Sequence, residues 1–300
     1  MIVIGSRGSQ LALWQAHWVE SQLTALGETC RIEIIKTTGD KVTDVPLAKV
    51  GGKGLFTKEI EDALLAGSVD VAVHSLKDMP TGLPEGLTLQ AVPAREDARD
   101  AMVGRKLDEL PPGARVGTSS LRRSAQLRAI RPDLAIETIR GNLDTRLRKL
   151  DEGQFDAIVL AAAGLRRLGW AARIAELLPE SICCPAVGQG ALAIETRNDE
   201  GVGATVCRRL DDAAARAAVT AERALLGALG GGCQVPIGAH ASVSDGRLSM
   251  RAVVVAPDGS AIVRGVREGA SSDAASLGED LAGELLAHGA RAILDSVYGI

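Results

Sequence analysis

Basic residues recur at the points where a strand is expected to end and a helix to begin. Arg122 and Arg123 follow the polar run Thr118–Ser120, and Arg140 and Arg146 occupy a similar junction further along. Two guanidinium groups in the first turn of a helix oppose its dipole, so they cost stability unless an anion offsets them. Arginine binds planar carboxylates and phosphates through paired hydrogen bonds. The alternative is that these side chains extend into solvent, but their recurrence favours an anion site.

A carboxylate beside a lysine is the second arrangement with chemical potential. Lys77-Asp78 follows the apolar run Val69–His74. Nearby positive charge lowers the pKa of an aspartate and keeps it ionised. Such a group could stabilise a cationic intermediate or relay a proton. It could equally cap a turn, and the spacing alone does not decide between these roles.

One cysteine lies in a glycine-rich loop. Cys233 stands within Gly230–Gly238, and glycines leave a sulfur sterically accessible. A thiol presented in this way is a plausible nucleophile or attachment point. The alternative is a small buried apolar side chain, which is the commoner state of a free cysteine.

Alternating strand and helix patterns over the first two hundred residues predict an α/β fold with mostly parallel strands. Expected strands cover 2–5, 31–36, 69–74, 115–117, 135–139 and 157–160, and expected helices cover 10–26, 55–66, 120–130 and 143–150. Ligands of such folds bind where loops leave the carboxyl ends of strands. The side chains at these junctions are Arg7, Ser9, Lys77, Asp78, Thr118, Ser120, Arg122, Arg123, Arg140, Arg146, Arg166 and Arg167.

Two segments are expected to carry the chain between lobes. The charged run Arg95–Asp100 follows a Pro/Gly-rich stretch, and the turn-rich run Pro185–Gly190 could return the chain. Two similar lobes joined in this way predict a cleft between them.

The last ninety residues differ: a helix over 211–229 precedes three strands near 237–243, 247–256 and 261–267, and two terminal helices follow. Tight-turn dipeptides between the strands predict an antiparallel sheet.

Composition excludes several classes of protein. The longest apolar run, Ala157–Leu165, is far shorter than the roughly 20 residues that cross a bilayer. A polar Ser6-Arg7 follows the first short apolar run, so no signal peptide is expected and the protein should be cytoplasmic. Five cysteines, an odd number, fit a reducing compartment, and without CxxC or HExxH no metal site is expected.

The charge distribution narrows the identity of the anion. Net charge is −4, yet residues 115–149 hold nine Arg/Lys against three Asp/Glu, a local net of +6. Single-stranded nucleic acid needs aromatic platforms, and aromatic residues make up 2% of the chain. The run Gly51–Gly54 is not a phosphate-binding P-loop, since Gly54 replaces the magnesium-binding hydroxyl residue. Carboxylates bound by several arginines fit best.

Several motifs, taken together and in order, resemble the porphobilinogen deaminase family. They are Ser6–Ala12, Gly51–Phe56, His74–Asp78, Val116–Arg123, Arg140–Asn142 with Thr145–Leu147, Pro185–Gly190 and Gly231–Gly238. The resemblance implies two lobes like those of type II periplasmic binding proteins and a small C-terminal α+β domain with a three-stranded antiparallel sheet. The expected domains are 1–95 with a return segment 190–209, then 100–187, and then 212–300.

The resemblance also implies an activity and a set of roles. Members are transferases that join four porphobilinogen molecules head to tail on a covalent dipyrromethane primer, lose ammonia at each addition, and release hydroxymethylbilane. By this resemblance Cys233 carries the primer through a thioether and Asp78 is catalytic. The cofactor would contact Lys77, Thr118, Ser120, Arg122, Arg123 and Gln189, and the substrate would contact Arg7, Ser9, Arg140, Arg146, Arg167, Lys53 and Phe56. No role is expected for Cys183-Cys184.

Two other hypotheses stay open at this stage. A non-catalytic protein could close two lobes on a small carboxylate, which predicts reversible binding and no covalent chromophore. A nucleic-acid-binding protein predicts steeply salt-dependent binding of oligonucleotides, which the acidic total charge disfavours. No nucleic acid, membrane or metal partner is expected, and a monomer is expected because nothing in the sequence demands an oligomer.

Overall fold

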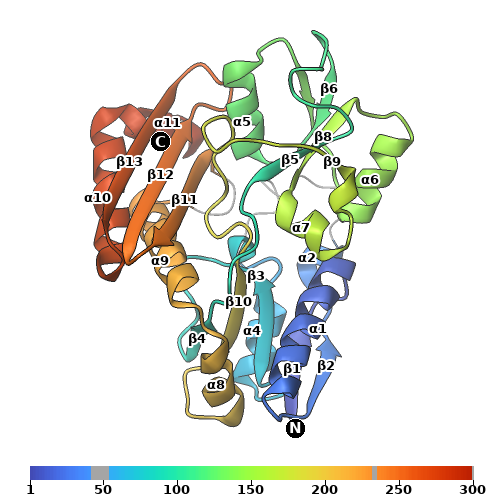
Figure 1. Cartoon of the computed structure of the whole chain (residues 1–300), viewed down its shortest axis with the longest axis vertical. Coiled ribbons are helices and arrows are strands. Elements are labelled where there is room, and N and C mark those ends of the chain that lie inside the picture. The colour runs from blue at the N-terminus through green and yellow to red at the C-terminus, as the bar shows by residue number, and fades with distance from the viewer. Residues whose placement is uncertain (42–53, 232–234, 299–300) are drawn as a thin grey trace. The chain divides into compact units, whose positions relative to one another are not determined.

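The computed structural model describes residues 1–41, 54–231 and 235–298, and the chain divides into two units. The first unit comprises Met1–Arg95 and Ala191–Arg216, and the second comprises Glu96–Gly190 and Ala217–Ile300. The described residues contain two five-stranded sheets and one three-stranded sheet, and the strands of the three-stranded sheet are the orange to red ones in Figure 1.

The first unit is built on a sheet with the strand order β2-β1-β3-β10-β4. Its strands are β1 (Ile2–Ser6), β2 (Cys30–Ile34), β3 (Val71–Ser75), β4 (Leu87–Ala91) and β10 (Leu192–Arg197). Its helices are α1 (Gln10–Ala25), α2 (Thr38–Lys41), α4 (Lys58–Leu65) and α8 (Val202–Cys207), with 3-10 turns at Leu76–Asp78 and Arg208–Leu210. β1 runs parallel to β2 and β3, whereas β10 runs antiparallel to β3 and β4.

Alternation of apolar side chains along the strands places a helix on each face of this sheet. Val71 and Val73 of β3 pack with Ala16, Val19 and Leu23 of α1. Ala72, between the two valines, points to the other face and joins the cluster formed by α4. Successive strand side chains point to opposite faces, so one short apolar strand serves both layers.

The second unit contains a sheet of the same design, in the order β7-β6-β8-β5-β9. Its strands are β5 (Asp100–Val103), β6 (Arg115–Gly117), β7 (Ala135–Glu137), β8 (Ala157–Ala161) and β9 (Ile174–Leu177). Its helices are α5 (Leu121–Ile130), α6 (Leu143–Asp151) and α7 (Ala162–Arg167), with a 3-10 turn at Ala171–Arg173. β6 is parallel to β7 and β8, and β5 is antiparallel to β8 and β9.

The C-terminal part of the second unit is an antiparallel sheet covered by helices. α9 (Ala213–Ala228) leads to β11 (Ile237–Ser244), β12 (Arg247–Val255) and β13 (Ile262–Ala270). α10 (Ala274–Leu285), a π-helical stretch (Leu286–Ala290) and α11 (Arg291–Tyr298) follow, and Figure 1 shows α10 beside β13. Residues of β11, β12, α9, α10 and α11 share one core, which confirms the predicted α+β domain.

The structure confirms the expectation of mostly parallel strands, since four of the five strands in each five-stranded sheet run in one direction, and it adds strands that were not predicted. β4, β5, β9 and β10 are additional strands, and β5 and β10 run antiparallel within their sheets. The stretch interpreted as a Pro/Gly-rich connection holds β4, and the charged run that ends at Asp100 leads into β5. Both antiparallel strands begin just after the chain passes from one unit to the other, at Glu96 and Ala191. The pairing of β5 and β10 depends on where the chain passes between the two units. The local periodicity of apolar residues cannot predict this.

Candidate functional site

The loops that leave the parallel strands of the second unit carry the polar residues predicted for this edge. β6 ends at Gly117 and is followed by Thr118 and Ser120. The Thr118 hydroxyl accepts from the Ser120 N–H at 3.2 Å, and the Ser120 hydroxyl caps α5 by accepting from the Arg123 N–H at 3.4 Å. A serine at this position satisfies an otherwise unpaired N–H of the first turn. The cap therefore fixes the start of the helix that bears both arginines.

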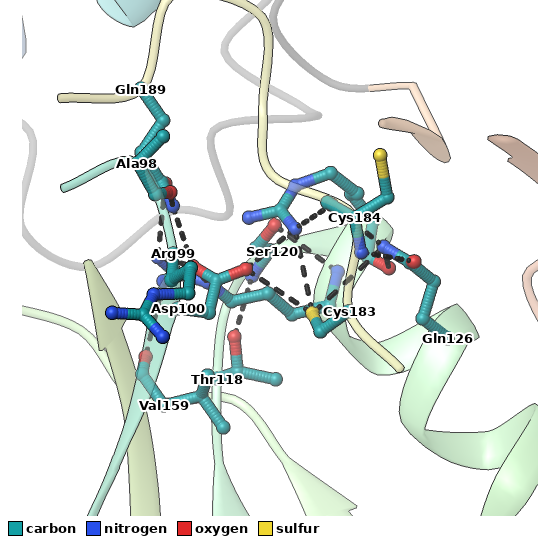
Figure 2. Close-up of polar contacts among 12 residues, drawn as sticks. Ala98, Arg99, Asp100, Thr118, Ser120, Gln126, Val159, Cys183, Cys184 and Gln189 are labelled. Carbon is teal, nitrogen blue, oxygen red and sulfur yellow. Dashed lines mark hydrogen bonds and ion pairs between the residues drawn. The ribbon is translucent and has the colours of Figure 1, made fainter. Parts of the chain in front are cut away.

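Asp100, at the start of β5, is the counter-ion of both arginines. Its Oδ2 lies 2.7 Å from Arg122 Nη1, and its Oδ1 accepts from Arg123 Nε at 2.9 Å and Nη2 at 2.7 Å. The side chains are 0% exposed for Asp100, 4% for Arg122 and 7% for Arg123. Figure 2 shows Asp100 among these polar contacts. The interpretation in which the arginines extend into solvent is therefore wrong.

Electrostatics within this buried group favour the ionised forms. Burial is the largest influence on Asp100 and would raise its pKa, but the charges and hydrogen bonds of Arg122 and Arg123 together hold that pKa far below its usual range. Burial lowers the pKa of Arg122, and Asp100 more than compensates, so the net shift is upward. The anion that offsets the two guanidiniums at the helix N-terminus is thus supplied by the protein itself.

The group still has capacity for another anion. Two guanidiniums share one carboxylate, which leaves one net positive charge. Arg122 Nε is buried and has no hydrogen-bond partner among the residues that the structure describes. A buried N–H without an acceptor costs about 1–3 kcal/mol. A carboxylate-bearing cofactor fits this surplus positive charge.

Gln189 joins the group from a separate segment. Its Nε2 donates to Asp100 Oδ1 at 2.9 Å and to the Ala98 carbonyl at 2.6 Å, and its Oε1 accepts from Arg123 at 3.3 Å. The next residue, Gly190, has φ +87°, and a Cβ there would collide with the Glu96 carbonyl oxygen. Only glycine permits this close approach of two backbone segments. The turn predicted at 185–190 therefore serves to place Gln189.

Cys183 and Cys184, which had no predicted role, contact the same group. Cys183 Sγ donates to Asp100 Oδ2 at 3.2 Å, and the Cys184 carbonyl accepts from Arg122 Nη1 at 2.5 Å and Gln126 Nε2 at 3.1 Å. Burial is the main cause that raises the pKa of both thiols, to about 12 for Cys184 and higher for Cys183. Both thiols are therefore neutral, and Figure 2 shows the Cys183 thiol directed toward Asp100.

The other predicted residues of the second unit follow its parallel strands: Arg140 follows β7, Arg146 lies in α6, and Arg167 is the last residue of α7. Arg140 and Arg146 are half-buried, and Arg146 Nε donates to the Gly141 carbonyl at 2.8 Å. Gly141 has φ +112°, and a Cβ there would lie 2.6 Å from Thr145 Cγ2. Arg167 Nη2 donates to the Gly190 carbonyl at 2.6 Å, and burial lowers the pKa of Arg167 to about 10. An additional anion would relieve this desolvated cation.

In the first unit, the predicted residues follow β1 and β3, which are parallel neighbours. Ser9 caps α1, its hydroxyl accepting from the Ala12 N–H at 3.3 Å. Arg7 Cζ lies 4.2 Å from the ring centroid of Phe56, a cation–π contact. Lys77 and Asp78 lie in the 3-10 turn after β3, where Lys77 is half-buried and Asp78 is exposed. Lys53 and Cys233 lie outside the described residues.

Asp100 is the principal residue that the sequence-based prediction missed. The signal was present, because Asp100 is the only charged residue of an otherwise apolar strand, Asp100-Ala101-Met102-Val103. A charge at the buried start of a strand requires an opposite charge nearby.

Among the described residues, no group of three or more His, Cys, Asp or Glu could hold a metal ion. None of the described helices is long and apolar enough to cross a membrane.

Two sheets of one design, each with polar and basic loops at the carboxyl ends of its parallel strands, define a two-sheet α/β protein to which a small α+β domain with a three-stranded antiparallel sheet is added. Two family models match this chain: "Porphobilinogen deaminase, dipyromethane cofactor binding domain" over residues 2–203, and "Porphobilinogen deaminase, C-terminal domain" over residues 216–287. The chain belongs to the porphobilinogen deaminase family.

Relatives named porphobilinogen deaminase match nearly the whole chain. The protein of Syntrophobacter fumaroxidans is 53% identical over 303 residues, which cover 99% of this chain and 98% of that one. The protein of Geobacillus kaustophilus is 53% identical over 302 residues, covering 99% and 97%. This chain is therefore a transferase of porphyrin biosynthesis that polymerises porphobilinogen and has dipyrromethane as its cofactor, which confirms the predicted family, activity and cofactor.

Solved structures with a similar α/β fold include solute-binding proteins. An ABC transporter periplasmic substrate-binding protein from Coxiella burnetii is 13% identical, with a TM-score of 0.43 over 70% of this chain and 91% of that chain. An ancestral cationic amino acid solute binding protein is 12% identical, with a TM-score of 0.44 over 70% and 87%. The strand orders described above, rather than these scores, define the fold class.

Proposed function

We propose that this chain joins four porphobilinogen molecules head to tail on a dipyrromethane primer attached to Cys233 through a thioether, and releases hydroxymethylbilane by hydrolysis. The observation that carries the residue assignment is the cluster of Asp100, Arg122 and Arg123, with its surplus positive charge and its buried, unpartnered Arg122 Nε. The cluster lies within the part of the chain that matches the cofactor-binding domain.

The proposed cofactor contacts are hydroxyl, amide and cationic groups. They are Lys77, Thr118, Ser120, Arg122, Arg123 and Gln189. Arg122 and Arg123 supply charge that is already oriented by Asp100, so binding a carboxylate requires little reorganisation of these side chains. Thr118 and Ser120 have hydroxyls that can donate to carboxylate oxygens while accepting from the backbone. The cofactor, when bound, supplies the pyrrole carbon to which the first substrate unit is joined.

The proposed substrate contacts are also mainly cationic, because porphobilinogen bears an acetate and a propionate. They are Arg7, Ser9, Lys53, Phe56, Arg140, Arg146 and Arg167. Arg7 is held over Phe56, which limits its freedom before binding. Arg167 is desolvated, and a carboxylate of the growing chain would offset the cost of burying its charge.

Asp78 is the proposed catalytic residue. Its carboxylate is exposed at the carboxyl end of β3, where a substrate can reach it. When the bond between carbon and the departing ammonia breaks, positive charge develops on the substrate. A carboxylate at this point stabilises the charge and accepts hydrogen bonds from pyrrole N–H groups.

The attachment is tested by intact mass of the denatured protein before and after incubation with porphobilinogen. The wild type and Cys30→Ser, a control at a partly exposed cysteine, should carry an added dipyrromethane mass that maps to the peptide containing Cys233. Cys233→Ser should carry none and should not turn over. Full activity of Cys233→Ser, or an adduct on another cysteine, would contradict the assignment.

We further propose three functional domains, which are 1–95 with 190–209, then 100–187, and then 212–300. We also propose that the enzyme is a cytoplasmic monomer and that it has no nucleic acid or membrane partner. Free Cys30, Cys183, Cys184 and Cys207 support a reducing compartment. The scarcity of aromatic residues disfavours nucleic acid. Light scattering at several concentrations tests the monomer, and a mass that rises with concentration would contradict it.

A further inference from the structure

Asp100 combines complete burial with an unusual number of strong partners. Its side chain is 0% exposed, and it accepts from Arg122, Arg123, Gln189 and Cys183, with the three nitrogen-bearing side chains at 2.7–2.9 Å. A buried carboxylate keeps its charge only when its oxygens are satisfied in this way. The cofactor and substrate contacts proposed above do not include this residue.

The partners of Asp100 come from two separate segments of the second unit, α5 and the connection between β9 and β10. Arg122 and Arg123 lie in the first turn of α5, Gln189 lies in the turn before Gly190, and Cys183 precedes that turn. Asp100 itself begins β5. A single carboxylate therefore sets the relative positions of three of the proposed cofactor contacts.

The two arginines would repel each other without Asp100. Arg122 Nη1 is further tied to the Cys184 carbonyl at 2.5 Å, and Arg123 Nη1 is tied to the Val159 carbonyl at 3.1 Å. These backbone acceptors orient each guanidinium but remove no charge. Among the residues that the structure describes, Asp100 is the only ion-pair partner of the two arginines, and it reduces their buried charge from two to one. Arg122 Nε has no acceptor within the same part of the chain.

We propose that Asp100 is a positioning residue for the dipyrromethane site: it locks Arg122, Arg123 and Gln189 into one arrangement whose single surplus charge matches a cofactor carboxylate. This inference rests on the proposed function, since it assumes that these three residues hold the primer. Asp100 acts through them and touches no reacting atom in this scheme.

The test compares substitutions at Asp100 with the same change at a carboxylate elsewhere in the unit. Asp100→Asn preserves shape but removes the charge, and its amide N–H groups would face other donors. Asp100→Glu keeps the charge but moves it by one methylene. Asp156→Asn is the control, because Asp156 accepts from the Arg115 N–H at 2.7 Å near the opposite ends of the same strands.

Primer loading is measured by intact mass after incubation with porphobilinogen, alongside far-ultraviolet circular dichroism, kcat and KM. Wild type and Asp156→Asn should load fully. Asp100→Asn should fall at least tenfold in loaded fraction, and Asp100→Glu should lie between it and the wild type. For Asp100→Glu, kcat should fall while KM stays within about twofold, because the proposed substrate contacts are other residues.

Each outcome bears on the inference. A folded Asp100→Asn that loads and turns over like the wild type would overturn it, as would Asp100→Glu loading no better than a folded Asp100→Asn. If Asp100→Asn does not fold, Asp100→Glu alone decides, and wild-type loading and kcat in that variant would overturn the inference. A wild type that never acquires a primer would instead refute the proposed attachment, so the two failures are distinguishable.

Discussion

Arg122 Nη1 lies 2.7 Å from Asp100 Oδ2, and both side chains are almost completely withdrawn from solvent. The pair is formed by residues 22 positions apart, one at the N-terminus of a helix and one at the start of a strand. Its strength depends on both groups being charged, and this makes the stability of the second unit sensitive to acid.

Acid should destabilise the protein partly through Asp100. The folded-state pKa of this carboxyl is lowered, so its contribution is fully present above the unfolded value of about 4 and is lost as the pH falls further. We expect the free energy of unfolding, measured in urea from pH 7 to pH 3, to decline below about pH 4. The slope of the unfolding free energy against pH should be smaller in Asp100→Asn than in Asp156→Asn. The difference should correspond to the uptake of at most one proton on unfolding. Equal slopes in the two variants would contradict the assignment.

Asp78→Ala should abolish turnover while the fold survives. The Asp78 side chain is exposed, so its removal should change the free energy of unfolding by less than about 0.5 kcal/mol. Loss of electrostatic stabilisation of a developing cation should lower kcat about 100-fold or more. Asp62→Ala, at an exposed position on α4, is the control and should be unaffected in both measurements. A near-wild-type rate for Asp78→Ala would exclude the catalytic role.

The buried cysteines should resist alkylation in the native protein. Burial raises the pKa of Cys184 and of Cys207 to about 12, so only about one thiol in 10,000 is ionised at pH 8. Iodoacetamide followed by peptide mass spectrometry should leave Cys183, Cys184 and Cys207 unmodified, and should modify all three after unfolding. Rapid native modification of Cys183 or Cys184 would show that the segment beside Asp100 opens.

Gly190→Ala should damage both stability and activity. The substitution combines a positive φ with a collision against the Glu96 carbonyl oxygen, and it displaces the adjacent Gln189. Gly153→Ala is the matched control, since Gly153 also has a positive φ, +72°, but no atom lies within 4 Å of its added Cβ. The control should lose about 1–2 kcal/mol of unfolding free energy from backbone strain alone. Gly190→Ala should lose clearly more, and a loss equal to that of the control would show that the segment shifts freely.

Helices and strands with strong local patterns could be predicted from the amino-acid sequence. Gln10–Leu26 and the three antiparallel C-terminal strands were predicted within one to three residues of α1, β11, β12 and β13, because periodicity and turn dipeptides are local properties. The strand-to-helix junctions also showed that Thr118, Ser120 and the arginines would lie at carboxyl ends of parallel strands. The ordered motifs were sufficient to indicate the family.

The anion that the two arginines face could be identified only from the folded structure. Their sequence required a counter-charge but did not identify Asp100, which lies in a segment interpreted as a crossing between lobes. The antiparallel directions of β5 and β10 escaped prediction for the same reason. Helix and strand patterns depend on neighbours a few residues away, whereas ion pairs and strand order depend on segments brought together by long loop closures, and their energy appears only when the chain is folded.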